Sequence, residues 1–381
     1  MNIDIVQRHA EDSPMHPQPA RSFTLPARFY TDPEIYLAER KAIFFKSWWC
    51  AGHKSQLPET GSYLTTRIID QSVVVTRDQD GTLRAFYNVC QHRGHELVSG
   101  SGTAKTRVLT CPYHAWAFNL DGSLRIARLT KAMPDFQKCD FALKAVRLEE
   151  FCGFIFVNLD PAATSLKEET GALEAEIRRY VPRIDDMVFA LRQDFEIKAN
   201  WKVVVDNFLE CYHCHPAHRD FVDLVDMESY RNIINGRYVS QISDAPRSNN
   251  AKAYSFEKGD VDFGYAGWYL WPNLTIWVYP GEANISALIM MPDGPDLTRE
   301  HLDWFLPRPE ITPQIQGAID YMNHTLQPED IALCESVQRG LKSQGYNQGR
   351  FVVDPDHPEL SEHAVHHFQK MVAEALEAEL S

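Results

Sequence analysis

The stretch CQHRGHEL at residues 90–97 and the stretch CPYH at 111–114, with eighteen residues between His92 and Cys111, decide the fold of the first half of the chain. Each stretch offers one thiol and one imidazole, and both lie among short β-rich runs broken by turns. The four ligand-type residues are Cys90, His92, Cys111 and His114. Two such loops on a β scaffold can together bind a metal through two sulfurs and two nitrogens.

Two kinds of site use this set of ligands. One is a structural zinc site, which would leave the protein colourless. In zinc sites, however, one stretch more often supplies two Cys and the other two His. Mixed Cys-x-His and Cys-x-x-His loops instead resemble the Rieske signature, in which two His replace two Cys on one iron of a [2Fe–2S] cluster. Gly94 and Pro112 then belong to the tight turns around the cluster. His95 does not fit the spacing and is interpreted as a supporting or packing residue.

A second stretch rich in potential metal ligands, NFLECYHCHPAH, covers residues 207–218. Residues 200–214 are predicted to form a helix, which would place Asp206, Glu210 and His213 on one stripe. Amphipathicity alone would make that stripe a solvated face. Pro216 is expected to break the helix after His215, so that His218 returns beside His213. The neighbouring thiols of Cys211 and Cys214 are interpreted as packing residues, because soft thiolates would close the site or favour zinc.

A carboxylate later in the chain completes this constellation. In QPEDIALCESVQRGL, residues 327–341, helical periodicity places Asp330 on the apolar face and points Glu329 away from it. A buried carboxylate needs a partner; the alternative is that Asp330 only favours the helix N-terminus through the dipole. Two imidazoles and one carboxylate form the facial triad of non-haem Fe(II) oxygenases. The predicted iron ligands are therefore His213, His218 and Asp330.

Composition limits the other possibilities. The chain has 381 residues, which suits two domains, and its net charge of −14 argues against a nucleic-acid partner. We find no signal peptide and no apolar segment that could span a membrane. The eight cysteines are interpreted as free thiols or metal ligands, which places the protein in the cytoplasm.

The predicted fold class is α+β. Residues 1–45 would form an N-terminal arm and a helix capped by Asp32, and residues 46–160 a β-rich Rieske domain. Residues 161–381 would form a catalytic domain, with an antiparallel sheet flanked by helices.

The two constellations, in this order, resemble the large subunit of Rieske non-haem iron oxygenases over roughly residues 25–370. The segments AFYNVCQHRGHEL, CPYHAWAF, DNFLECYHC and ESVQRGLKS are similar to motifs of the branch that oxidises carnitine and betaines. The resemblance implies a [2Fe–2S] cluster on the first four ligands, a mononuclear Fe(II) on the triad, and a head-to-tail homotrimer. It also implies O2 as co-substrate and a separate NAD(P)H-dependent reductase with flavin and iron–sulfur centres. No G-x-G-x-x-G fingerprint suggests that this chain binds NADH itself.

In most of the family an Asp three residues before the first iron His bridges the two centres across a subunit interface. This sequence has Glu210 there, with Asp206 as a rival bridge. That difference favours a small quaternary ammonium substrate over the alternative, an aromatic-ring-hydroxylating dioxygenase. Aromatic side chains suit such a cation: the candidates are Phe208, Tyr212, Trp268, Tyr269, Trp271, Trp277 and Tyr279, of which strand alternation places Tyr269, Trp271, Trp277 and Tyr279 on one face. A non-enzyme alternative is an electron carrier that uses only the cluster.

Overall fold

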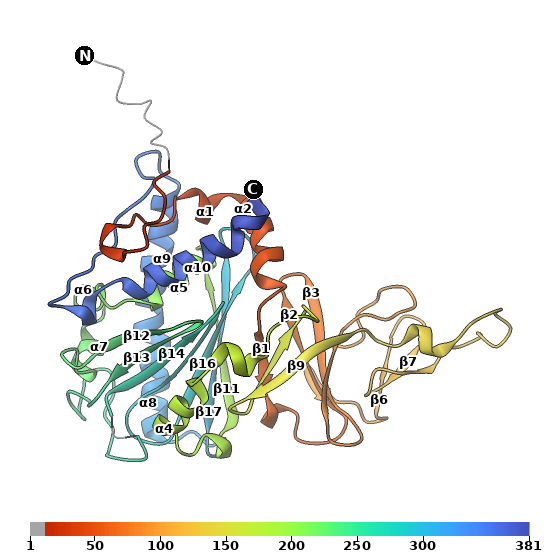
Figure 1. Ribbon diagram of the computed structural model, residues 1–381. Helices are drawn as coiled ribbons and strands as arrows, with labels where there is room; N and C mark the ends of the chain where they lie inside the picture. The colour runs from red at the N-terminus through yellow and green to blue at the C-terminus, as the bar shows by residue number, and fades with distance from the viewer. Residues whose placement is uncertain (1–11, 262, 381) are drawn as a thin grey trace.

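A β-rich lobe projects from a larger α+β body in the computed structural model, which describes residues 12–261 and 263–380 (Figure 1). The predicted α+β class is confirmed. The lobe ends in β6 and β7, whereas α6 lies at the opposite side of the body (Figure 1). Among the described residues, no helix is both long and apolar enough to cross a membrane.

The N-terminal helices fix the start of the chain to the catalytic body. They are η2 (Pro19–Arg21), α1 (Arg28–Thr31), α2 (Pro33–Glu39) and the π-helical turn η3 (Arg40–Phe44). The Asp32 side chain caps α2 by accepting from the Glu34 N–H at 2.8 Å, as predicted. Glu39 at its end is wholly buried and pairs with the ammonium of Lys202 and, at 2.9 Å, with the indole of Trp201. These contacts attach α2 to α5, the helix that leads into the second metal-binding stretch.

Two sheets build the lobe. A seven-stranded antiparallel sheet has the order β1-β10-β9-β4-β3-β2-β5, and a smaller one has the order β6-β7-β8. Their strands are β1 (Trp49–His53), β2 (Ser62–Ile68), β3 (Gln71–Arg77), β4 (Leu83–Tyr87), β5 (Ser101–Thr103), β6 (Val108–Thr110), β7 (Ala117–Asn119), β8 (Leu124–Ile126), β9 (Ala145–Phe151) and β10 (Phe154–Asn158), with short helices η4 (Lys54–Gln56) and η5 (Lys138–Phe141). The two Cys/His stretches are the loops β4–β5 and β6–β7, and Cys90 and Cys111 lie in the apolar core between the sheets.

A second seven-stranded antiparallel sheet, β11-β17-β16-β15-β14-β13-β12, forms the centre of the body. Its strands are β11 (Val188–Ile197), β12 (Arg231–Asn235), β13 (Tyr238–Ser243), β14 (Tyr265–Leu270), β15 (Leu274–Val278), β16 (Ile285–Pro292) and β17 (Thr298–Leu306). The helices are α3 (Leu166–Thr170), α4 (Leu173–Tyr180), η6 (Ile184–Asp186), α5 (Trp201–Phe208), α6 (Cys214–Ala217), α7 (Arg219–Leu224), α8 (Pro313–Tyr321), the π-helical η7 (Met322–Leu326), α9 (Gln327–Leu341), η8 (Pro358–Leu360) and α10 (His363–Leu380).

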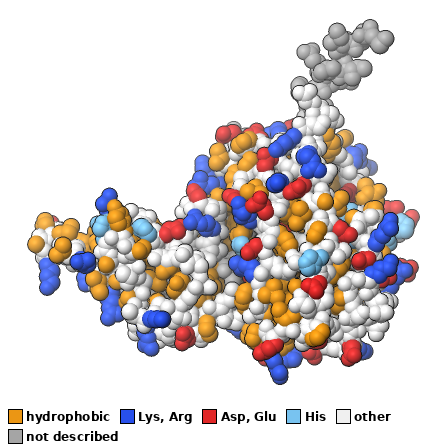
Figure 2. Space-filling view, turned by 180° about the vertical axis from the view of Figure 1, so that it is seen from behind, with side chains coloured by type: hydrophobic (Ala, Val, Ile, Leu, Met, Phe, Trp, Pro, Cys, Tyr) orange, Lys and Arg blue, Asp and Glu red, His pale blue; other side chains and the backbone are white. Residues whose placement is uncertain are grey.

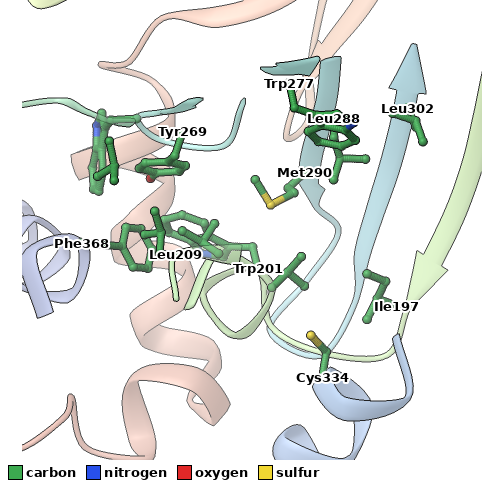
Figure 3. Close-up of a cluster of buried hydrophobic side chains, with 14 of the residues drawn as sticks. Ile197, Trp201, Leu209, Tyr269, Trp277, Leu288, Met290, Leu302, Cys334 and Phe368 are labelled. Carbon is green, nitrogen blue, oxygen red and sulfur yellow. The ribbon is translucent and has the colours of Figure 1, made fainter. Parts of the chain in front are cut away.

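Strand alternation separates the two faces of this sheet. One face packs against α4, where Trp268 donates its indole N–H to Glu176 at 3.1 Å. The other face packs against α5, α9 and α10, and it carries Tyr269, Trp271, Trp277 and Tyr279, which confirms the predicted shared face. In Figure 3, Trp277 lies close to Leu288 and Met290 on that face. The second metal-binding stretch is packed against the same face.

Candidate active site: two metal-binding constellations

The stretch 207–218 is not one continuous helix. Helix α5 ends at Phe208, so the predicted helical stripe of Asp206, Glu210 and His213 is wrong. Leu209 is fully buried, and the Glu210 carboxylate accepts hydrogen bonds from the backbone N–H groups of Tyr212 and His213. These side-chain bonds replace the continuation of the helix.

The break also comes earlier than Pro216. That proline lies in the first turn of α6, where a missing N–H does no harm, so the break precedes His213 instead of following His215. His218 lies just after α6 and just before α7. The chain reversal between the two imidazoles is thus made by residues 209–213 together with the short helix.

Three ligand atoms converge beside this turn. His213 Nε2 lies 3.0 Å from His218 Nε2, and His218 Nε2 lies 3.0 Å from Asp330 Oδ1. The third separation, from His213 Nε2 to Asp330 Oδ1, is 3.7 Å. Within the described residues these three form a group of potential metal ligands whose atoms all lie within 4.8 Å of one another. Two neutral nitrogens and one carboxylate suit a mononuclear iron with open coordination positions.

Carboxylates also hold the outer nitrogens of both imidazoles. Glu210 hydrogen-bonds His213 Nδ1, and Glu329 lies 2.8 Å from His218 Nδ1. Such partners fix the ring orientation and leave Nε2 free for a metal. The prediction that Glu329 points away is therefore wrong: its carboxylate is partly exposed, yet the side chain is long enough to reach the outer edge of His218.

The charges around His218 are strong. Burial disfavours its imidazolium, but hydrogen bonds and charge from Asp330 and Glu329 outweigh burial and raise the pKa of His218 to about 9. This ring thus stands in an anionic environment that attracts a cation, whether a proton or a metal.

Asp206 lies apart from the triad. Its Oδ2 accepts from the Tyr30 hydroxyl at 2.7 Å and from the Gln369 amide at 2.9 Å, while Oδ1 is buried without a hydrogen-bond partner. Burial raises the pKa of Asp206 to about 8. Glu210, and not Asp206, is the carboxylate that contacts His213.

The two cysteines beside His213 are joined. Cys211 and Cys214 form a disulfide, so the prediction that both are free thiols is wrong, although both are buried as expected of packing residues. The turn brings their Cα atoms to 4.9 Å, within the range that a disulfide spans. Sequence spacing alone does not reveal that geometry, because it depends on the turn that replaces the predicted continuous helix.

A pocket opens beside the triad on the aromatic face of the sheet. Of the predicted aromatic candidates, Phe208, Trp277 and Tyr279 line it. Tyr212 is 51% exposed, Trp268 lies on the other face, and Tyr269 packs against Phe368 of α10. Further lining residues that the sequence analysis did not identify are Phe221, Tyr230, Tyr265 and Glu300.

The alternation of side chains along the strands predicts two of these residues, Tyr265 and Glu300. Tyr265 lies four positions before Tyr269 on β14, and Glu300 pairs with Met290, another pocket residue. Burial raises the pKa of Glu300 to about 8, and the amide of Gln327 hydrogen-bonds its carboxyl group. A buried, acidic group therefore forms part of the pocket wall.

The first constellation is built from two equivalent loops. The Cys90 N–H donates to His95 O and the Cys111 N–H donates to Trp116 O, each at 2.8 Å. The fifth residue of each loop, Gly94 or Ala115, has a positive φ and donates its N–H back to the cysteine carbonyl. The two loops thus have the same backbone conformation, and each one holds a Cys/His pair in the same way.

The side chains of the two loops meet. The imidazoles of His92 and His114 have centroids 4.6 Å apart, and His114 Nδ1 is buried without a hydrogen-bond partner. Burial raises the pKa of the Cys90 thiol, and the neighbouring Cys111 thiol raises it further. Hydrogen bonds from the backbone N–H groups of His92 and Arg93 lower this pKa but do not cancel the rise. An orphaned nitrogen beside two close thiols is the donor set that an iron–sulfur cluster requires. His95 lies outside the group, exposed and in contact with Glu96.

Comparison with known proteins agrees with both constellations. Residues 47–137 match the Rieske [2Fe–2S] domain, and residues 184–378 match the ring hydroxylating alpha subunit (catalytic domain). The chain belongs to the Rieske oxygenases. The predicted resemblance is confirmed, and the enzyme is an oxidoreductase that carries a [2Fe–2S] cluster and a mononuclear iron.

Two curated relatives and one solved structure of Rieske oxygenases are similar over nearly the whole chain. The carnitine monooxygenase oxygenase subunit of Escherichia coli (strain K12) is 41% identical over 93% of this chain and 94% of the relative. The chloroplastic choline monooxygenase of Amaranthus tricolor is 32% identical over 91% of this chain and 76% of the relative. The structure of a quaternary ammonium Rieske monooxygenase superposes with a TM-score of 0.89 at 37% identity, covering 96% and 99% of the two chains.

Proposed function

We propose that this protein is the oxygenase component of a monooxygenase that hydroxylates a small quaternary ammonium compound, carnitine or a betaine. Hydroxylation next to the nitrogen gives an unstable product whose C–N bond then breaks. Carnitine would release trimethylamine, and a betaine would release formaldehyde and a tertiary amine. The 41% identity to a carnitine monooxygenase oxygenase subunit supports this assignment.

The composition of the pocket carries the proposal. Its described lining residues include six aromatic residues other than histidine and three carboxylates, but no Lys or Arg. The aromatic residues are Phe208, Phe221, Tyr230, Tyr265, Trp277 and Tyr279, and the carboxylates are Glu210, Glu300 and Asp330. Aromatic faces attract a quaternary ammonium by about 0.5–2 kcal/mol per ring.

We assign the metals to the residues already described. The cluster would be held by Cys90, His92, Cys111 and His114, and the mononuclear iron by His213, His218 and Asp330. When bound, these centres supply electron relay and O2 activation. The chain's own residues orient the ligands, exclude water and position the substrate.

The domain boundaries follow from these assignments. We place an N-terminal arm and helix at 1–45, the Rieske domain at 46–160 and the catalytic domain at 161–381. The family matches at 47–137 and 184–378 fall inside the last two ranges, which supports these limits.

We further propose a homotrimer in which the cluster of one subunit serves the iron of the next. In one chain the two constellations lie on opposite sides of the molecule (Figure 1). The tip of the lobe exposes Tyr113, Leu129 and Met133 around the cluster loops. Figure 2 shows hydrophobic and basic side chains gathered on this lobe, although the whole chain has a net charge of −14. A basic, apolar tip suits docking on an acidic neighbour.

Glu210 is our candidate for the bridge between the centres. It hydrogen-bonds His213 and lines both the substrate pocket and a separate hollow that includes Tyr30 and Glu362. A neighbouring cluster ligand in that hollow could donate to the second side of the carboxylate. Electrons would come from a flavin and iron–sulfur reductase that uses NAD(P)H, and the cytoplasm is where that reductase would be supplied.

The test is an assay of the purified holoenzyme with a Rieske reductase and O2. Carnitine, γ-butyrobetaine, glycine betaine, choline and benzoate are supplied in turn, and products are identified by mass spectrometry. We expect oxidation of at least one quaternary ammonium compound with loss of an amine or formaldehyde. Oxidation of benzoate alone would favour the ring-hydroxylating dioxygenase instead.

A further inference from the structure

One indole N–H in the substrate pocket has no acceptor. Trp277 is 3% exposed and lines the pocket, and its Nε1 is buried without a hydrogen-bond partner. Six other tryptophans have an acceptor for this group: Trp48, Trp49, Trp201, Trp268, Trp271 and Trp304. Because buried donors are nearly always paired, an unpaired donor on a residue that lines a pocket points to a ligand acceptor.

The neighbouring strand carries a second donor. Tyr265 also lines the pocket, and its hydroxyl lies over Gly267, where a Cβ would approach Oη to 2.4 Å. Gly267 pairs directly with Trp277 across β14 and β15, so the hydroxyl lies over the strand position next to Trp277. Burial raises the pKa of Tyr265 above its ordinary range, which keeps the hydroxyl protonated as a donor.

The remaining pocket offers little else to an anion. Its described lining has no Lys or Arg, and the amide of Gln241, on the same row of the sheet, already donates to Phe208 O at 2.6 Å. An indole N–H can only donate, so its missing partner must be an acceptor. The acceptor that gains most from two neutral donors is a carboxylate.

We propose that Trp277 and Tyr265 bind the carboxylate of a zwitterionic quaternary ammonium substrate and so select betaine-type compounds over choline-type alcohols. This inference rests on the proposed function and refines it. The Gly267 position matters because the absence of a side chain there admits the Tyr265 hydroxyl. The ammonium end is then directed toward the remaining aromatic and acidic wall.

The test uses Trp277→Phe, Tyr265→Phe and Gly267→Ala in the holoenzyme, with carnitine and choline as probes. Loss of a hydrogen bond to a charged group should raise the KM and the dissociation constant for carnitine roughly 10- to 100-fold. The dissociation constant for choline, measured by calorimetry, should change less than about threefold, because choline has no carboxylate for the donors to bind. Trp304→Phe is the matched control, since its indole lies on the same face but donates to Gln193; it should alter neither constant.

The possible failures are separable. If the wild type oxidises no quaternary ammonium compound, the proposed function fails. If the wild type oxidises carnitine but the variants weaken carnitine and choline equally, the two side chains act only as part of the pocket wall, and the inference is overturned. Gly267→Ala keeps both donors, so it tests their placement even if one ring deletion fails to fold.

Discussion

The Glu329 carboxylate lies 2.8 Å from Nδ1 of His218, on the opposite edge of the ring from Asp330. One helix, α9, therefore supplies both a triad carboxylate and the group that orients a triad imidazole, from adjacent positions. This arrangement makes the geometry of His218 depend on the first turn of α9.

Glu329→Gln should lower the affinity for iron without changing the fold. The amide is a weaker acceptor for the His218 Nδ1–H, and loss of such partners typically lowers metal affinity about 10- to 100-fold. Iron titration of the metal-free protein measures the effect. Glu335→Gln, on the same helix but bonded to the Lys198 N–H, is the control. Equal affinities for Glu329→Gln and wild type would contradict the role.

With Fe(II) supplied in excess, so that the weaker site left without the His213 partner is filled, Glu210→Ala should hold the cluster and the mononuclear iron yet lose substrate oxidation by about 100-fold or more. The reason is that removing a catalytic link raises the barrier by several kcal/mol. Metal analysis and paramagnetic resonance establish the retention, and single-turnover mixing of reduced protein with O2 measures the loss. Glu210→Asp, with a shorter carboxylate, should recover part of the activity. Full, coupled turnover by the alanine variant would refute the bridge.

The unfolding free energy should fall as pH rises from about 4 to 8. Burial raises the pKa of Asp206 from 3.8 to about 8, so in this window the folded state holds a proton that the unfolded state has lost. Each such proton contributes a slope of about 1.4 kcal/mol per pH unit. Asp206→Asn should flatten the fall, measured by urea unfolding at several pH values. The exposed Asp296→Asn should leave it unchanged; an unaltered slope in Asp206→Asn would be the contrary result.

Alkylation can test the Cys211–Cys214 disulfide. Unfolded, non-reduced protein should be labelled at the six free cysteines, whereas prior reduction should expose all eight. Intact mass measures the difference, and peptide mapping locates it. Cys139, which is exposed, serves as the internal control for complete labelling. Eight labels without reduction would show that the two thiols are free.

The metal constellations were predictable because ligand chemistry restricts residue type and spacing. The two Cys/His loops and the set of His213, His218 and Asp330 follow from such restrictions. Strand alternation likewise predicted that Trp277 and Tyr279 share a face, since that period is local.

Features that depend on tertiary contacts were not predictable. Helix α5 ends at Phe208, and the next residue, Leu209, is buried in the core, a tertiary contact that hydrophobic periodicity does not encode. Glu210 then accepts hydrogen bonds from the N–H groups that follow it. The Cys211–Cys214 disulfide could not be predicted for the same reason, because it requires the turn at residues 209–213 in place of a continuous helix. The contact of Glu329 with His218 could not be predicted, because helical periodicity describes where a Cβ points and not how far a long side chain reaches.

The central claim is that one chain carries two separate iron centres, and metal analysis of purified holoenzyme tests it most directly. We expect about three iron atoms and two acid-labile sulfides per chain, with a Rieske-type paramagnetic signal on reduction. His213→Ala should lose about one iron and keep that signal. Two irons in the wild type, or zinc in place of the third, would contradict the account.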